Sequence, residues 1–285
     1  MKFGLAFANS GLNALPANAA HLARTAERVG FESLWTVEHP VIPTGYQSTY
    51  PYNPSGRIPG GEDFDIPDPL VWLAFVAAHT STIRLATGIL ILPMRNTLIT
   101  AKEVATLDQL SGGRVTLGIG VGWLEEEFDA LGAPFRDRGR RTDEMVAAMR
   151  AVWSGRASFS GDLISFAEVI SLPVPPQGQV PIVIGGHTEA AARRAGRIGD
   201  GFFPGKGDLA LLTHLVDVLR SAARDAGRDP DAIELTTTAT MDLDAMAQLS
   251  ELGFSRFVTA PRGRTPEEID DNLHRFAEKV IAQAT

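Results

Sequence analysis

A small set of polar and glycine residues stands at or just after the ends of the apolar runs in this sequence. His39 is well suited to proton transfer, because an imidazole can serve as an acid or a base near neutral pH. Glycines such as Gly88 let the backbone approach a ligand closely, and Lys206 can bind an anion. The set is Glu38, His39, Thr87, Gly88, Ile89, Gly120, Gly122, Trp123, Gly185, Gly186, His187 and Lys206.

The same positions lack the constellations that define several enzyme classes. They contain no pair of carboxylates set for glycoside hydrolysis, no serine in a G-x-S-x-G turn and no H-E-x-x-H spacing. The chain has no cysteine, which excludes disulfides, thiolate catalysis and cysteine-bound metals. We therefore expect no metal site. Glycine, apolar surface, histidine and a few cations suit a large planar cofactor with a phosphate tail.

These residues also have interpretations without a function. His39 could be an ordinary loop histidine, Gly88 a bulge in a strand, and Lys206 a solvated loop charge. Trp123 could simply cover the core. The acidic run 125–127 is interpreted as the solvated first turn of a helix, stabilised by the helix dipole. The choice depends on what the fold brings next to each residue.

The elements that must position these residues alternate between strand and helix patterns. Residues 84–92 and 114–119 are apolar runs, as in strands buried on both faces of a parallel sheet, and 97–110 between them has helical spacing. Eight strands alternate with eight main helices, which predicts the α/β class and a TIM (β/α)8 barrel, with residues 1–285 as a single domain. The predicted strands are 2–8, 33–37, 84–92, 114–119, 180–184, 201–203, 233–240 and 255–259.

Two details bear on this architecture. Residues 154–176 break the alternation, and two short apolar runs within them predict a hairpin, inserted with a short helix after the fourth strand. A doubly wound open sheet is the alternative, but it would require G-x-G-x-x-G after the first strand, where only Gly11 is present. In a TIM barrel the carboxyl ends of all strands meet at one mouth, so the candidate residues would lie together.

One long segment has no periodicity. Residues 41–67 are rich in proline, glycine, tyrosine and aspartate, and a loop of this length inside a compact domain usually has a function. Its three tyrosines, Tyr46, Tyr50 and Tyr52, suggest an aromatic lid over the mouth. Asp68 follows as a predicted N-cap of the next helix.

Composition limits the partners of this chain. The 26 Lys and Arg residues against 34 Asp and Glu residues give a net charge of −8, and no basic run of the kind that binds nucleic acid is present. No stretch approaches the ~18 apolar residues of a membrane span, and the start of the chain is interpreted as a first strand. We therefore expect a cytoplasmic protein with a small-molecule substrate, and a homodimer as the commonest oligomer.

Five strings of the sequence occur in an order and at barrel positions typical of one family. Together they resemble the luciferase-like monooxygenase superfamily, and within it the actinobacterial branch that uses the deazaflavin coenzyme F420. The resemblance covers roughly residues 1–220 and is weak from about residue 233. The strings are GFESLWTVEH (30–39), IRLATGILILPMRNTLITAKEVATLDQLSGGRVTLGIGVGW (83–123), EEFDALGAPFRDRGRRTDE (126–144), PIVIGG (181–186) and GDGFFPGKG (199–207).

The resemblance implies roles for several residues. A cis peptide at Gly88–Ile89, in a bulge at the end of the third strand, would support the back of the cofactor ring, and His39 would lie near the ring and handle a proton. Gly185, Gly186 and Lys206 would meet the phosphate tail. With the other residues of the mouth, this predicts His39 as catalytic and cofactor contacts from Glu38, His39, Thr87, Gly88, Ile89, Gly122, Trp123, Gly185, Gly186, His187 and Lys206.

Three functional hypotheses follow. The first is an oxidoreductase that transfers a hydride between C5 of F420 and a small organic substrate; the second is a two-component, FMN-dependent monooxygenase; the third is a flavin- or F420-binding protein without turnover. Some F420-dependent sugar-phosphate dehydrogenases carry a catalytic glutamate where this chain has Trp123, which argues against that chemistry here. The arginine set of flavin-dependent sulfonate monooxygenases has no good match either.

Overall fold

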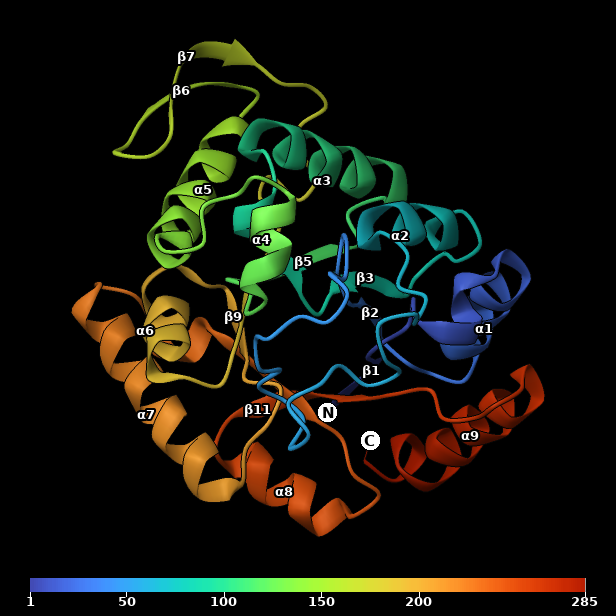
Figure 1. Cartoon of the computed structure of the whole chain (residues 1–285). Coiled ribbons are helices and arrows are strands. Elements are labelled where there is room, and N and C mark those ends of the chain that lie inside the picture. Colours follow the sequence, from blue (N-terminus) through green and yellow to red (C-terminus); the bar gives the residue numbers. More distant parts are fainter. Residues whose placement is uncertain (285) are drawn as a thin grey trace.

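A computed structural model describes residues 1–284 and shows a closed parallel barrel surrounded by helices (Figure 1). Its strands are β1 (Lys2–Leu5), β2 (Ser33–Thr36), β3 (Arg84–Thr87), β4 (Leu90–Ile91), β5 (Val115–Gly120), β8 (Ile182–Gly185), β9 (Gly201–Phe203), β10 (Glu234–Thr238) and β11 (Phe254–Thr259). β1 pairs with β2 and β11, and the order continues through β10, β9, β8 and β5 to β3, which closes the ring. With β3 and β4 counted as one interrupted strand, this is the predicted eight-stranded TIM barrel.

Helices cover the outside of the ring, so the strands are buried on both faces and need continuous apolar sequence. All six residues of β5 are buried. The predicted N-cap is confirmed, because the Asp68 carboxylate accepts hydrogen bonds from the Leu70 and Val71 amides, both at 2.9 Å. The helices are α1 (Pro16–Arg28), α2 (Pro69–Ala77), α3 (Thr97–Ser111), α4 (Glu125–Ala130), α5 (Arg138–Val152), α6 (Glu189–Ile198), α7 (Leu209–Asp225), α8 (Leu243–Glu251) and α9 (Pro266–Lys279), with short 3-10 turns at Gly11–Ala14, Leu92–Met94, Pro230–Ala232 and Ile281–Gln283.

The third barrel strand is interrupted. Residues 84–92 are predicted as one strand, but the structure divides them into β3 and β4 around the Gly88–Ile89 peptide, which is cis as the resemblance predicts. The Gly88 amide still donates to the Thr36 carbonyl at 2.5 Å, so the chain stays attached to β2 up to the break. Gly88 and Ile89 therefore leave the sheet at its carboxyl edge.

A tryptophan fills the inside of the barrel beneath this break. Trp35 is 0% exposed, and its ring lies 5.6 Å from the ring of Phe203. A Cβ atom at Gly88 would lie 3.1 Å from the Trp35 ring, and one at Gly4 would lie 2.9 Å from its indole nitrogen. Glycine at these positions makes room for the large ring, which closes the barrel below the mouth.

The predicted insertion after the fourth barrel strand is confirmed. After β5, α4 and α5 the chain forms β6 (Arg156–Ser160) and β7 (Ser165–Ile170), which pair antiparallel as a hairpin. The rings of Phe159 and Phe166 stack across the hairpin with centroids 6.0 Å apart. Figure 1 shows the hairpin outside the ring of helices, at the top of the view. It contributes no residue to the mouth described below.

Candidate active site

His39 lies after β2 and is anchored by a buried carboxylate. Its Nδ1 atom is 2.9 Å from Oε2 of Glu127, which belongs to α4 and is fully buried. The other oxygen, Oε1, accepts a hydrogen bond of 3.2 Å from the Val41 amide. Within residues 1–284 no hydrogen bond reaches Nε2 of His39. The imidazole is thus held on one side and open on the other.

The acidic turn 125–127 is predicted to be a solvated helix start, and the structure differs from that prediction. Only Glu125 is exposed, and the last glutamate of the turn is the buried partner of the histidine. The carboxylate of Glu126 accepts hydrogen bonds from the Gln47 amide at 2.6 Å and from the amide and hydroxyl of Ser48 at 3.1 and 2.7 Å. The prediction was wrong because it considered only the helix, whereas the partners come from a loop far earlier in the chain.

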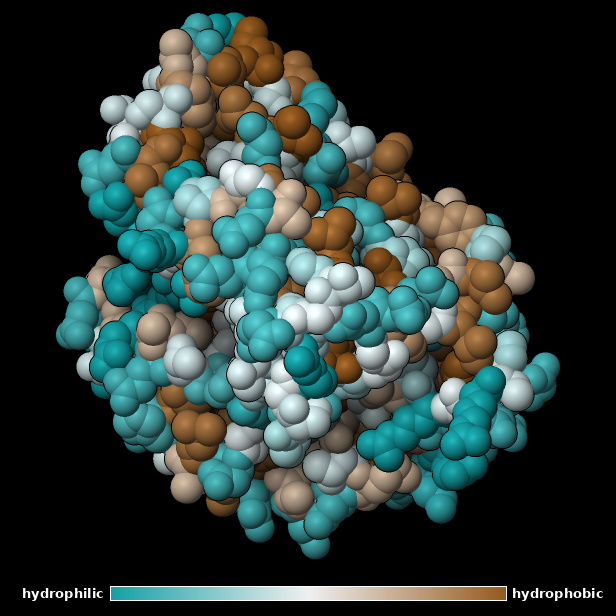
Figure 2. Space-filling view, viewed as in Figure 1, coloured by the Kyte–Doolittle hydropathy of each residue, from teal (hydrophilic) through white to brown (hydrophobic). Residues whose placement is uncertain are grey.

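That loop, residues 41–67, is the predicted aromatic lid and is hereafter called the lid. Its Tyr50 ring lies 5.2 Å and its Tyr46 ring 5.6 Å from the ring of Trp123, which follows β5. Trp123 also lies 5.7 Å from the imidazole of His39, edge to face. The lid crosses the centre of the barrel mouth, and side chains fill the middle of this face (Figures 1 and 2).

The far end of the lid touches the opposite side of the mouth. The Tyr52 ring lies 4.9 Å from that of His187, after β8, and the Lys206 ammonium donates to the Pro51 carbonyl. Nδ1 of His187 is buried and has no hydrogen-bond partner among residues 1–284. Burial together with the Lys206 charge lowers the pKa of this histidine. A buried polar atom without a partner is unusual and suggests that one is missing.

The floor of the mouth is apolar and lined by glycine. A Cβ atom at Gly120 would lie 2.5 Å from Cδ1 of Ile89, and one at Gly185 would lie 2.5 Å from its Cγ2. The half-buried side chain of Ile89 therefore extends over the ends of β5 and β8, where only glycine leaves room for it. An apolar floor at the same mouth as an anchored histidine, with a lysine and an unpaired polar atom near the end of the lid, fits a planar ring with an anionic tail.

Glu38 faces a different set of partners. It is 5% exposed, and its carboxylate accepts hydrogen bonds from the Ile91 amide and from Arg95, whose Nε lies at 2.8 Å. Arg95 also contacts the Asp68 carboxylate at 2.6 Å. Burial raises the pKa of Glu38, while Arg95 and the Ile91 amide oppose that effect. This network ties the end of β2 to the start of α2, and a contact of Glu38 with a cofactor stays a prediction.

Three further predicted residues have contacts within the protein. The Thr87 hydroxyl donates to a β5 carbonyl at 2.6 Å. Gly122 has a positive φ of 80°, and a Cβ there would lie 2.6 Å from the Phe128 ring. The amide of Gly186 donates to the Phe203 carbonyl at 3.1 Å. These contacts explain the residue types structurally, and their contacts with a ligand stay predictions.

A cleft of about 200 Å³ opens where the two ends of the lid meet the barrel. It reaches the anchored histidine, and its volume is below that of the pockets that hold drug-sized ligands. Its lining residues are Glu38, His39, Pro40, Ile66, Pro67, Asp68 and Pro69.

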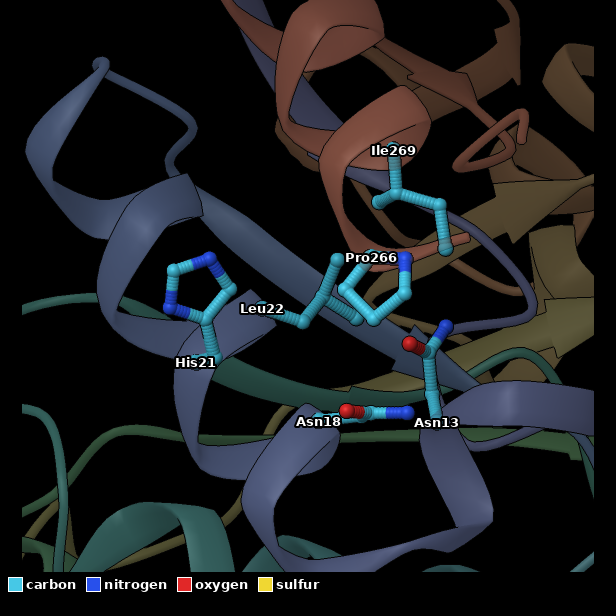
Figure 3. Close-up of a pocket in the computed structure, with 6 residues that line it drawn as sticks. All are labelled: Asn13, Asn18, His21, Leu22, Pro266 and Ile269. Carbon is cyan, nitrogen blue, oxygen red and sulfur yellow. The ribbon is translucent and has the colours of Figure 1, made fainter. Parts of the chain in front are cut away.

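A second hollow lies between α1 and α9 (Figure 3). Its volume of about 10 Å³ is the space of about one water molecule. It is lined by Asn13, Asn18, His21, Leu22, Pro266 and Ile269, and we assign no function to it. Among residues 1–284 no group of His, Asp and Glu side chains could hold a metal ion, and no helix could cross a membrane.

The contacts of Glu126 predict that the lid responds to pH. Its hydrogen bonds, first that from the Ser48 hydroxyl and then that from the Gln47 amide, lower its pKa from 4.5 to about 2. A lowered pKa means that these contacts stabilise the closed lid fully above pH 4.5 and lose strength as the pH falls toward 2. We expect Glu126→Gln to raise the hydrogen-exchange rates of the Gln47 and Ser48 amides several-fold at pH 7. In acid, the wild-type rates, corrected for the intrinsic exchange rate, should approach those of the variant.

Glu125→Gln is the matched control, because this neighbouring carboxylate is exposed and accepts no hydrogen bond within the described chain. It should leave the exchange of both lid amides unchanged. Equal exchange in all three proteins at neutral pH would show that the Glu126 contacts do not hold the lid.

A closed parallel barrel with an anchored histidine at its mouth, under the lid, defines the chain as a TIM-barrel protein. The model of the luciferase-like monooxygenase family matches residues 1–277, and the chain belongs to that family. The match extends beyond residue 233, where the resemblance was weak, so the last two barrel strands belong to it as well.

Proteins similar to this chain include two relatives by sequence and one by structure. The uncharacterized protein Rv0940c of Mycobacterium tuberculosis is 31% identical over 272 residues, which are 92% of this chain and 94% of that protein. The F420-dependent glucose-6-phosphate dehydrogenase of Kineococcus radiotolerans is 31% identical over 236 residues, 80% of this chain and 65% of that one. The structure of the coenzyme F420 dependent tetrahydromethanopterin reductase from Methanopyrus kandleri matches with a TM-score of 0.79 at 19% identity, covering 100% of this chain and 99% of that one. This last likeness supports the fold alone.

Proposed function

We propose that this protein is an F420-dependent oxidoreductase that acts on a small organic molecule. The observation that carries the proposal is His39, anchored at Nδ1 and without a hydrogen bond at Nε2 among residues 1–284, at the same barrel mouth as the apolar side chain of Ile89. The relative named as an F420-dependent glucose-6-phosphate dehydrogenase supports this choice of cofactor. When bound, coenzyme F420 would supply a hydride acceptor or donor at C5 of its deazaflavin ring.

The residues of the mouth would have different roles in the reaction. If the substrate is an alcohol, its oxidation removes a hydride from carbon and a proton from oxygen and leaves a carbonyl compound. Nε2 of His39 would accept that proton, and His39 would return it when the reaction runs in the reverse direction. Ile89 would support the ring of the cofactor. Lys206 and His187 would face its anionic tail after the lid has moved.

The lid would close again over the bound molecules. Its tyrosines and Trp123 would cover the reacting atoms and exclude water, which would otherwise compete for the proton. Trp123 cannot exchange a proton at this position, so His39 is the proton partner in this proposal. The cytoplasmic location, the homodimer and the single domain stay predictions.

A cofactor titration tests the assignment. We expect the fluorescence of F420 to be quenched or shifted by the purified protein, with a dissociation constant in the micromolar range or tighter, and FMN to bind more weakly under the same conditions. Binding of FMN without any binding of F420 would reject the cofactor.

The alternative is a two-component, FMN-dependent monooxygenase, which the description of the matched family favours. Such an enzyme consumes oxygen when it receives reduced flavin and a substrate. Substrate-dependent oxygen consumption with reduced FMN, and none with reduced F420, would therefore support the alternative over the oxidoreductase.

A further inference from the structure

The buried carboxylate of Glu127 contacts two groups from different parts of the site. Oε2 lies 2.9 Å from Nδ1 of His39, and Oε1 accepts the amide of Val41, the first residue of the lid, at 3.2 Å. Glu127 is 0% exposed, and the side chain of His39 is 9% exposed. Both carboxylate oxygens are thus in use, in a place that water does not reach.

We propose that Glu127 is a positioning residue that fixes the tautomer of His39. An ionised carboxylate can only accept hydrogen bonds, so the neutral imidazole must carry its proton on Nδ1 to bond with it. The lone pair then lies on Nε2, which has no partner among residues 1–284 and is free to take a proton from a substrate. Without this contact the ring could carry its proton on Nε2 and could not act as a base there.

The contact with Val41 links this arrangement to the lid. The lid begins at the residue whose amide occupies the second oxygen of Glu127, so the carboxylate is fully bonded only with that segment in place. Trp123 limits the ring from another side, at 5.7 Å and edge to face. The geometry therefore orients the imidazole and sets its tautomer in the closed protein.

The first test uses the cofactor-free wild-type protein. Nitrogen-15 NMR of labelled histidine side chains distinguishes the two tautomers of a neutral ring, and the signal that is missing in His39→Asn identifies this histidine among the six of the chain. We expect the Nδ1–H form at a pH where the ring is neutral. A ring in the Nε2–H form would overturn the proposal, whether or not Glu127→Gln folds.

The second test, Glu127→Gln, replaces the carboxylate by an amide of the same shape. The new side chain would have one oxygen, and the Val41 amide still requires an acceptor, so the NH2 group would face Nδ1 and favour the Nε2–H tautomer. We expect this variant to shift the NMR signals toward that form and to lower kcat by about 10²–10⁴-fold, as for the loss of a general base, while KM changes little. Retention of both the Nδ1–H signal and the wild-type kcat would overturn the proposal.

The matched control is Glu125→Gln, two residues earlier in the same turn. This carboxylate is exposed and has no contact with the histidine, so the variant should keep both the Nδ1–H tautomer and the turnover of the wild type. An equal tautomer shift in both variants would show that the charge of the turn matters and not the contact of Glu127, which would also overturn the proposal.

The role in turnover rests on the proposed function, but the tautomer is a property of the protein alone. Failure to bind F420 together with an Nδ1–H ring would reject the cofactor and keep the positioning role. Turnover with F420 together with an Nε2–H ring would keep the cofactor and reject the positioning role. The two proposals therefore fail separately.

Discussion

Replacement of His39 by asparagine should lower kcat by about 10²–10⁴-fold, the usual loss when a general acid or base is removed. The amide nitrogen of asparagine can take the place of Nδ1 and donate to Glu127, so the buried carboxylate keeps a partner. The variant lacks the rest of the imidazole ring, and with it the Nε2 atom that would exchange the proton. Turnover would be measured with F420 and a panel of alcohols, aldehydes and activated alkenes, and F420 affinity by fluorescence.

The control separates loss of chemistry from loss of structure. His274→Ala removes an exposed histidine on α9, whose Nδ1 bonds with the Asp270 carbonyl, and it should retain wild-type turnover. His39→Asn should bind F420 nearly as well as the wild type and melt within a few degrees of it. A decrease in kcat of only about threefold in His39→Asn would be much smaller than expected. It would mean that solvent or another group exchanges the proton.

The barrel could be predicted from sequence because its strands and helices follow local rules. A strand buried on both faces must be apolar throughout, as in β5, and the Asp68 cap depends on amides two and three residues away. The break in the third strand has no local signal apart from Gly88. Periodicity predicts one strand there, and only the resemblance to a family placed the cis peptide correctly.

The site was predicted less completely, because its contacts are not local. Glu127 stands in a run of three glutamates that the helix dipole explains fully, and nothing near it in sequence indicates that it is buried against a histidine 88 residues earlier. Glu38 stands beside that histidine, yet its carboxylate is occupied by Arg95. Helix geometry shows only that one of three consecutive glutamates faces the core when the helix lies across a barrel mouth, and it does not identify the partner.

Gly118→Ala should have the largest effect on folding. Gly118 lies within β5, and a Cβ atom there would lie 1.9 Å from the carbonyl oxygen of Thr87 in the neighbouring strand. The clash is with backbone, so the two strands would have to separate inside the closed barrel. We expect a loss of about 3 kcal/mol or more in the free energy of unfolding, and a fall of about 10 °C in Tm by thermal denaturation.

Gly120→Ala, two residues further along the same strand, is the matched variant. Its Cβ would lie 2.5 Å from Cδ1 of Ile89, which is the far end of a side chain that can rotate away. We therefore expect nearly wild-type Tm but weaker F420 binding, since the displaced side chain would rise into the mouth. Adding Ile89→Ala should relieve the crowding at Gly120 and leave the clash at Gly118 unchanged. Equal Tm values for Gly118→Ala and Gly120→Ala would contradict this division of the glycines of β5 between folding and binding.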